Sequence, residues 1–222
     1  MKLTKEDLKY PQIDAAFRYI YDNIDIYSKG DLQDGDIYEF GVGSGTSTRK
    51  ITKYIIDNLH PRDMCSYIFG FDSFEGLPKE HDGIEVFSKF SEGSYKFDEI
   101  KQFTGVGVPR FIYKGWFKDI KFNDNMGPAL LVHIDCDLYT STIDAFKFLL
   151  ENKLIVKGTL VAYDEFRSTN DPLSGGESKA HIEFFQPSLW DGGMDCIEIW
   201  HNIYYDKDTG QSIRQSLFEV VQ

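Results

Sequence analysis

The sequence predicts an α/β fold, a doubly wound and mostly parallel sheet that closes in an antiparallel hairpin. Five short β-prone segments alternate with helix-like segments, which is the pattern of strands joined by crossover helices. Two of these segments, 129–134 and 159–162, are almost wholly apolar, as expected for strands covered on both faces. The last two strand-like segments flank Asp206-Lys207-Asp208-Thr209-Gly210, a sequence typical of a hairpin turn.

The first part of the chain contains an opening helix, two strands and the helix between them. Apolar residues at helical spacing predict a helix within residues 6–28. A first strand is expected over 36–41 and a second over 67–71. Between them, the apolar spacing of residues 48–59 predicts a helix that ends at His60-Pro61.

The remaining elements follow from shorter signals. Residues 75–98 are rich in Gly, Glu, Lys and Ser and are expected to form a long loop. The pattern then predicts, in order, a helix near 96–104, strands over 110–113, 129–134 and 159–163 with a helix between the last two, and strands over roughly 194–200 and 212–221. A length of 222 residues suits one domain with a substantial core.

The composition narrows the classes of partner. The 36 acidic residues exceed the 24 basic ones and give a net charge of −12, which would repel the phosphates of DNA or RNA. Cys65, Cys136 and Cys196 form neither a disulfide framework nor a zinc motif, and they suit a reducing compartment. The charged N-terminus and the lack of an 18-residue apolar run argue against a signal peptide and a membrane span. We therefore expect a cytoplasmic protein that acts on a small molecule, without nucleic-acid or membrane partners.

A glycine-rich turn follows the first predicted strand. Gly41-Val42-Gly43-Ser44-Gly45 leads from strand to helix, where backbone N–H groups can face a ligand. The spacing is not the dinucleotide GxGxxG fingerprint, because Thr46 stands in place of the third glycine. Glu39 could reach a ligand ammonium group, and Asp72 after the second strand could bind both hydroxyls of a ribose. The structural alternatives are a tight turn without a ligand and a capping role for Asp72.

Acidic side chains end the fourth and fifth predicted strands. His133-Ile134-Asp135-Cys136-Asp137 places its polar residues on one face, and Asp164-Glu165 follows the next strand. Together these offer up to four carboxylates to a hard divalent cation such as Mg²⁺ or Ca²⁺. Zn²⁺ fits less well because His133 is the only nearby nitrogen ligand. Separate capping carboxylates are the structural alternative.

Two histidines are candidate bases for proton transfer. His133 precedes the first acidic group, and His181 follows a loop-to-helix segment shortly after the second. For Glu177, Lys179 and His181, a solvated helix face is the favoured interpretation.

Four blocks of sequence occur in the order Tyr38-Glu39-Phe40-Gly41-Val42-Gly43-Ser44-Gly45, Phe71-Asp72-Ser73-Phe74-Glu75-Gly76-Leu77-Pro78, Lys114-Gly115-Trp116-Phe117 and His133-Ile134-Asp135-Cys136-Asp137-Leu138-Tyr139-Thr140-Ser141-Thr142. Together they resemble the macrocin O-methyltransferase family of class I S-adenosylmethionine-dependent enzymes, over roughly residues 30–185. The resemblance implies a seven-stranded Rossmann-like sheet, with residues 1–222 as a single methyltransferase domain and residues 1–30 as a helical cap or lid. It also implies O-methylation of a hydroxyl, often on a sugar, with S-adenosylmethionine as cofactor and a divalent metal, usually Mg²⁺.

Carried over by position, the resemblance assigns roles to residues of this chain. The implied cofactor-binding residues are Glu39, Gly41, Gly43, Ser44, Asp72, Ser73, Gly93, Ser94, Gly115, Trp116 and Asp135. The implied metal ligands are Asp135, Asp137, Asp164 and Glu165. Candidates for catalytic groups are His133, His181 and Asp135.

Two positions depart from the family pattern. Asp164-Glu165 stands where the family usually has two aspartates, so Glu165 carries its carboxylate one methylene further from the backbone. Thr140 stands where the family has glutamate. Residues 170–222 match poorly, and the identity of the acceptor is not predicted.

Three other functions fit the same residues. They are a metal-independent methyltransferase of this fold, an NAD-dependent oxidoreductase, against which Thr46 counts, and a non-catalytic binding module. Assembly into a homo-oligomer is compatible with the sequence.

Overall fold

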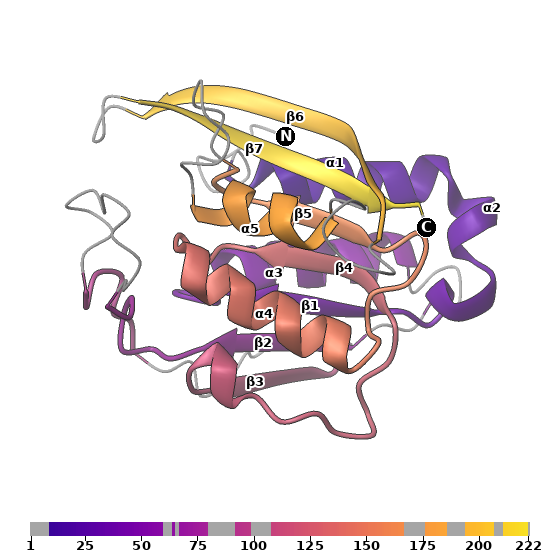
Figure 1. The fold of residues 1–222 in the computed structure, drawn as a ribbon. Helices are drawn as coiled ribbons and strands as arrows, with labels where there is room; N and C mark the ends of the chain where they lie inside the picture. The colour runs from indigo at the N-terminus through magenta and orange to yellow at the C-terminus, as the bar shows by residue number, and fades with distance from the viewer. Residues whose placement is uncertain are drawn as a thin grey trace.

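The computed structural model describes residues 9–59, 64, 67–79, 92–98, 108–166, 176–185, 194–206 and 211–221. These residues form a seven-stranded sheet with helices on both faces (Figure 1). The strands are β1 (Asp36–Phe40), β2 (Ile68–Asp72), β3 (Arg110–Lys114), β4 (Ala129–Ile134), β5 (Leu160–Tyr163), β6 (Cys196–Asp206) and β7 (Gln211–Val220). The helices are α1 (Pro11–Asp22), α2 (Ile24–Tyr27), α3 (Thr46–Tyr54), α4 (Tyr139–Glu151) and α5 (Gly176–Phe185), with short helical turns at Gly30–Leu32, Ile55–Leu59 and Phe117–Asp119.

The strand order is β3-β2-β1-β4-β5-β7-β6, and β7 runs antiparallel to both of its neighbours while the other pairs are parallel. The predicted fold class, a mostly parallel doubly wound sheet with an antiparallel C-terminal hairpin, is confirmed. Strand β4 has the predicted bounds. Strand β6 extends beyond the predicted 194–200 because it pairs with β7 from Cys196 to Asp206.

Two predicted segments lie largely outside the described residues. Of the helix expected near 96–104, only residues 96–98 are described, and these are not helical. Residues 207–210 of the expected hairpin turn are not described either. The described parts of the expected loop, 75–79 and 92–98, contain neither helix nor strand, in agreement with the prediction.

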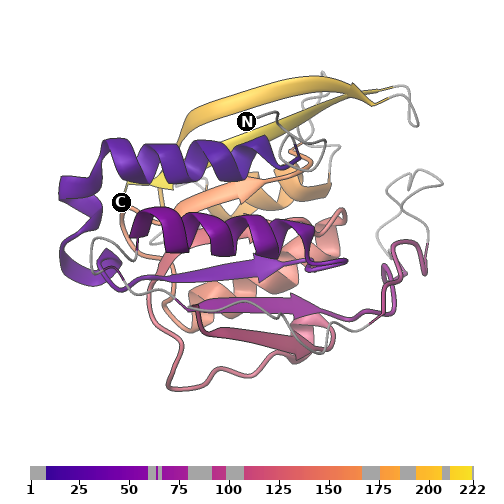
Figure 2. The ribbon, with the colours of Figure 1, turned by 180° about the vertical axis from the view of Figure 1, so that it is seen from behind.

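Different helices cover the two faces of the sheet. Figure 1 shows α4 and α5 over one face, and the reverse view in Figure 2 shows α1 and α3 side by side over the other. Strands β1 and β4 are buried along their whole length, which explains the apolar sequence of residues 129–134. Among the helices in the described ranges, none is long and apolar enough to cross a membrane.

Aromatic side chains join the strands on the face covered by α4. Tyr38 and Phe40 of β1 stack on Phe69 and Phe71 of β2, with ring centroids 5.4 and 5.0 Å apart. Because side chains alternate along a strand, Ile37 points to the other face and packs with the apolar side of α1. Helix α1 lies in the segment expected to form a cap or lid, and it builds part of this second core.

The strand order reverses between β1 and β4. Strand β1 pairs with β2 on one side and with β4 on the other, so the connections leave their carboxyl ends in opposite directions. Phe40 lies opposite Ile134, and just beyond this pair the N–H of Asp135 donates to Phe40 O at 2.9 Å. In an open α/β sheet, this reversal is where a ligand-binding crevice forms.

Asp36, at the start of β1, is a buried carboxylate at the opposite end of the sheet. Its side chain is 2% exposed and accepts hydrogen bonds from the backbone N–H groups of Gly127 (2.7 Å) and Tyr67 (3.0 Å). Burial outweighs these bonds and raises the pKa of Asp36 to about 6. The folded protein therefore binds this proton more tightly than the unfolded chain does.

We predict that Asp36 makes the free energy of unfolding fall as the pH rises from about 4 to about 6. The carboxyl group ionises first in the unfolded chain, so this group lowers stability by up to about 3 kcal/mol across the window. Asp36→Asn removes the titration, and its stability relative to wild type should rise over the same window. Urea unfolding at a series of pH values tests this, and a pH-independent difference would contradict it.

Candidate active site

A cavity of about 770 Å³ opens beyond the carboxyl ends of the parallel strands. Its lining includes Lys9 and Tyr10 before α1, residues 41–44 after β1, Asp72, Ser73 and residues 76–79 at the end of β2, residues 115–118 after β3, residues 135–137 after β4, and Asp164 and Glu165 after β5. The volume lies within the range of small-molecule sites. The chain thus brings its predicted strand-end residues together around one cavity.

The glycine turn brings the backbone of β1 against that of β4. Gly41 has a φ of +95°, and a Cβ built on it would lie 1.9 Å from the carbonyl oxygen of Asp135. Only glycine permits both the dihedral angle and this approach. The turn ends at Gly45, the N-cap residue of α3, so N–H groups of the first helical turn open beside the cavity.

Asp72 ties this turn to the loop after β2. Its two carboxylate oxygens accept hydrogen bonds from the N–H groups of Gly43 and Phe74, each at 2.7 Å. Burial raises the pKa of Asp72, and these bonds oppose the shift. Asp72 therefore lines the cavity in a fixed orientation.

The residues that the resemblance assigned to a cofactor fall into three groups. Those that line the cavity are Gly41, Gly43, Ser44, Asp72, Ser73, Gly115, Trp116 and Asp135. Gly93 and Ser94 instead bond to the backbone of Leu77, at 2.9 and 2.8 Å, and so support a lining segment. Glu39 is fully buried and accepts a hydrogen bond from the hydroxyl of Thr48.

A buried polar chain runs beneath the cavity from Glu39 to Asp164. Glu39 Oε1 lies 3.6 Å from His133 Nδ1, and Gln12 Nε2 lies 3.3 Å from His133 Nε2. The same amide of Gln12 donates to Asp164 Oδ1 at 2.9 Å. The separation between Glu39 Oε1 and His133 Nδ1 exceeds a hydrogen-bond length, and neither atom has a hydrogen-bond partner in the described part of the chain.

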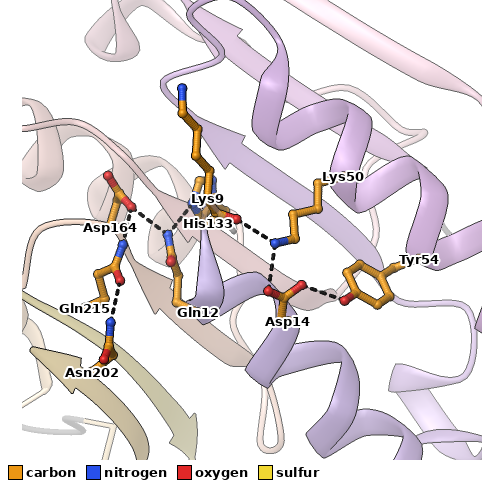
Figure 3. Close-up of polar contacts among 9 residues, drawn as sticks. All are labelled: Lys9, Gln12, Asp14, Lys50, Tyr54, His133, Asp164, Asn202 and Gln215. Carbon is orange, nitrogen blue, oxygen red and sulfur yellow. Dashed lines mark hydrogen bonds and ion pairs between the residues drawn. The ribbon is translucent and has the colours of Figure 1, made fainter. Parts of the chain in front are cut away.

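Two amides hold one oxygen of Asp164, as Figure 3 shows. Gln12 of α1 and Gln215 of β7 each donate to Asp164 Oδ1 at 2.9 Å, and Asn202 of β6 supports Gln215 at 3.4 Å. Sequence reasoning did not single out either glutamine. The available signal was a polar residue on the apolar face of a helix, because Gln12 is fully buried beside Ile13.

The four predicted metal ligands all line the cavity. Burial raises the pKa of Asp135 well above its usual range, and the nearby carboxylates of Asp164, Asp137, Glu177 and Glu165 raise it further. Among the described residues, no group of three His, Cys, Asp or Glu side chains forms a ready-made metal site. The donor set, crowded oxygen anions, nevertheless has the chemistry of a hard divalent cation site.

The expected solvated face of α5 is wrong for two of its three residues. Glu177 is 1% exposed and accepts hydrogen bonds from backbone N–H groups. His181 is 7% exposed, and its Nδ1 lies 2.7 Å from the hydroxyl of Tyr163. Burial lowers the pKa of His181 to about 3, so His181 packs as a neutral residue of the core. This face of α5 turns inward because its rings pack on Tyr163 of β5 and on Phe146 of α4.

Tyr10 is a cavity residue that sequence reasoning missed. It precedes α1 with a φ of +57°, in the left-handed region, and its ring lies edge-on to His133. Burial raises the pKa of its hydroxyl, and the charges of Asp135 and Asp164 add to the effect. The phenol therefore stays protonated and can donate a hydrogen bond into the cavity.

Comparisons with known proteins identify similar sequences and folds. A family model described as Macrocin-O-methyltransferase (TylF) matches residues 24–174. The fold is similar to that of the calicheamicin methyltransferase CalS11, which is 17% identical with a TM-score of 0.62 over 96% of this chain and 80% of that chain. It is also similar to the O-methyltransferase NovP, which is 18% identical with a TM-score of 0.56 over 97% and 81% of the two chains.

A third similar structure is the N-methyltransferase NodS from Bradyrhizobium japonicum WM9 in complex with S-adenosyl-l-homocysteine. It is 10% identical, with a TM-score of 0.50 over 96% of this chain and 98% of that chain. At these identities, the three structures show a shared fold. No curated protein gives a significant sequence match.

We predict that Gly41→Ala lowers the free energy of unfolding by at least about 3 kcal/mol, because the added Cβ forces the ends of β1 and β4 apart. Gly30→Ala is the matched control, since Gly30 has a φ of +64° but open space around its Cβ position. The control should lose only about 1 kcal/mol, the cost of the left-handed dihedral. Chemical unfolding measures both variants. If Gly41→Ala and Gly30→Ala lose the same free energy of unfolding, the contact with Asp135 is unimportant.

Proposed function

The chain belongs to the macrocin O-methyltransferase (TylF) family and is an S-adenosylmethionine-dependent O-methyltransferase, and on this premise we propose that it methylates a hydroxyl of a sugar or sugar-containing metabolite with the help of a divalent cation. One observation carries the proposal: the glycine turn and the four carboxylates line the same cavity. A methyl donor on the turn and an acceptor among the carboxylates would meet beside Gly41 and Asp135.

The methyl donor is proposed to bind as the sequence predicts. Of the predicted ligands, those that line the cavity would contact the donor: Gly41, Gly43 and Ser44 at the methionine end, Asp72 and Ser73 at the ribose, and Gly115 and Trp116 at the adenine. Glu39, Gly93 and Ser94 would support these residues from behind the lining. The fixed orientation of Asp72 and the open N–H groups at the start of α3 support this assignment.

The part of the cavity that would bind the acceptor is lined by the carboxylates. Asp135, Asp137, Asp164 and Glu165 would hold a hard divalent cation, with Mg²⁺ as the favoured ion. The mutual repulsion of these half-buried carboxylates supports a cation, because a cation would relieve it. CalS11 is described as a TDP-rhamnose 3′-O-methyltransferase, which supports a sugar as acceptor.

When both are bound, S-adenosylmethionine would supply an electrophilic methyl group and the cation would lower the pKa of the acceptor hydroxyl. The backbone of Asp135 lies against Gly41, and Asp135 also lines the cavity, so its carboxylate would hold the acceptor hydroxyl and take its proton. His133 lies one layer below and would act by orienting Asp164 through Gln12. Alignment of this kind is worth up to about 7–11 kcal/mol of the barrier.

Family membership decides against the NAD-dependent oxidoreductase. It leaves a metal-independent methyltransferase of the same fold as the alternative. The cytoplasmic location and the oligomeric state stay predictions.

The function is tested by following methyl transfer to a panel of sugars, nucleotide sugars and non-sugar alcohols, with and without Mg²⁺. We expect methylation of a sugar hydroxyl that needs Mg²⁺ and stops on exhaustive chelation. Undiminished turnover after chelation would select the metal-independent alternative. Turnover of the non-sugar alcohols alone would reject the sugar acceptor.

We predict that Asp135→Asn and Asp164→Asn each lower kcat by more than the roughly 10–100-fold typical of a lost outer-shell partner. The dissociation constant of S-adenosylhomocysteine, measured by calorimetry, should stay within about threefold of wild type, because the donor would bind through the glycine turn. Asp57→Asn is the control, since Asp57 pairs with Lys53 on the surface of the helix after β1. Folded variants that lose donor binding would refute the division of the cavity into a donor site at the glycine turn and an acceptor site at the carboxylates.

A further inference from the structure

Glu177, in the first turn of α5, places its carboxylate behind the cavity. The side chain is 1% exposed. One oxygen accepts the N–H groups of Cys136 at 2.9 Å and Asp137 at 3.2 Å, and the other accepts the N–H of Glu165 at 3.4 Å. A single carboxylate therefore bonds to the backbone after β4 and to the backbone after β5.

These bonds begin where the sheet ends. The N–H of Asp164 donates to Ile134 O at 3.0 Å, which is the last backbone bond between the two segments given by the strand register. Beyond it, residues 135–137 and Glu165 turn away from the sheet and line the cavity. Glu177 continues the connection that the strands no longer provide.

The start of α5 is fixed in this position. A Cβ built on Gly176 would lie 2.6 Å from the carbonyl oxygen of Asp137, so helix and turn are in direct backbone contact. Asp137 itself has a φ of +61°, in the left-handed region that non-glycine residues seldom adopt. The start of α5 and the turn at Asp137 therefore hold each other in place.

The hydrogen bonds of Glu177 distinguish it from a residue that only fills space in the core. The buried carboxylate has lost its contact with water, and three backbone N–H groups take the place of water as its partners. An apolar side chain would fill the same space without adding charge. It would also remove the hydrogen bonds that join the segment after β4 to the segment after β5.

We propose that Glu177 is a positioning residue that sets the spacing between the carboxylates after β4 and those after β5. It acts through the backbones of residues 136, 137 and 165. It contacts neither the methyl donor nor the acceptor. This role rests on the proposed function, in which those carboxylates hold the cation and the acceptor.

The test uses the full chain with Glu177→Gln and Glu177→Asp. Glutamine keeps the volume but turns one acceptor oxygen into a donor group, and aspartate keeps the charge but shortens the reach. We expect both to lower kcat by about 10–100-fold, with the dissociation constant of S-adenosylhomocysteine within about twofold of wild type. Hydrogen exchange should become faster at the amides of residues 136, 137 and 165.

Glu183→Gln is the matched control. It is the same substitution on the same helix, and glutamine can still accept the hydrogen bond from the hydroxyl of Tyr139. We expect unchanged kcat and unchanged amide exchange for this variant.

Three results would overturn the proposal. The first is a folded Glu177→Gln variant with wild-type kcat, and the second is loss of donor binding together with activity, which marks a general structural defect. The third needs no variant: in the wild-type protein, the three amides exchange as fast as exposed loop amides. The proposed function fails separately, if Asp135→Asn and Asp164→Asn keep wild-type turnover.

Discussion

The backbones of Gly41 and Asp135 touch at the point where the strand order of the sheet reverses. On one side of this contact the chain turns into α3 and on the other it turns toward α4, so a cavity opens between the two connections. A Cβ at position 41 would lie 1.9 Å from a carbonyl oxygen, so the contact requires glycine. Because the turn and the carboxylates extend from the two sides of this contact, the proposed methyl donor and acceptor sites are neighbours.

The carboxylates that line the cavity are held in place by polar groups behind them. Amides of Gln12 and Gln215 fix Asp164, while the carboxylate of Glu177 fixes the turns around it. Amides and N–H groups satisfy lone pairs but supply no positive charge. These partners therefore leave the charge of the carboxylates uncompensated, which supports the proposed divalent cation.

Much of this arrangement could be predicted from the sequence, because strands covered on both faces are apolar and end abruptly. The bounds of β4 and the position of Asp135 just beyond it follow from that rule. The partners of the inward-facing polar residues could not be predicted. Gln12 and Glu177 lie on helices, and helical periodicity shows which side is apolar but not which polar group will find buried partners. The length of β6 was underestimated because its exposed edge position leaves polar residues among the apolar ones.

The central claim is that one cavity brings a methyl donor on the glycine turn to an acceptor on the carboxylates. A crystal structure with S-adenosylhomocysteine and Mn²⁺, recorded at the manganese absorption edge, tests it most directly. The account predicts the homocysteine end against Gly41 and Gly43, and an anomalous peak bound by Asp135 and Asp164. S-adenosylhomocysteine in the cavity with no anomalous peak among the carboxylates would contradict it.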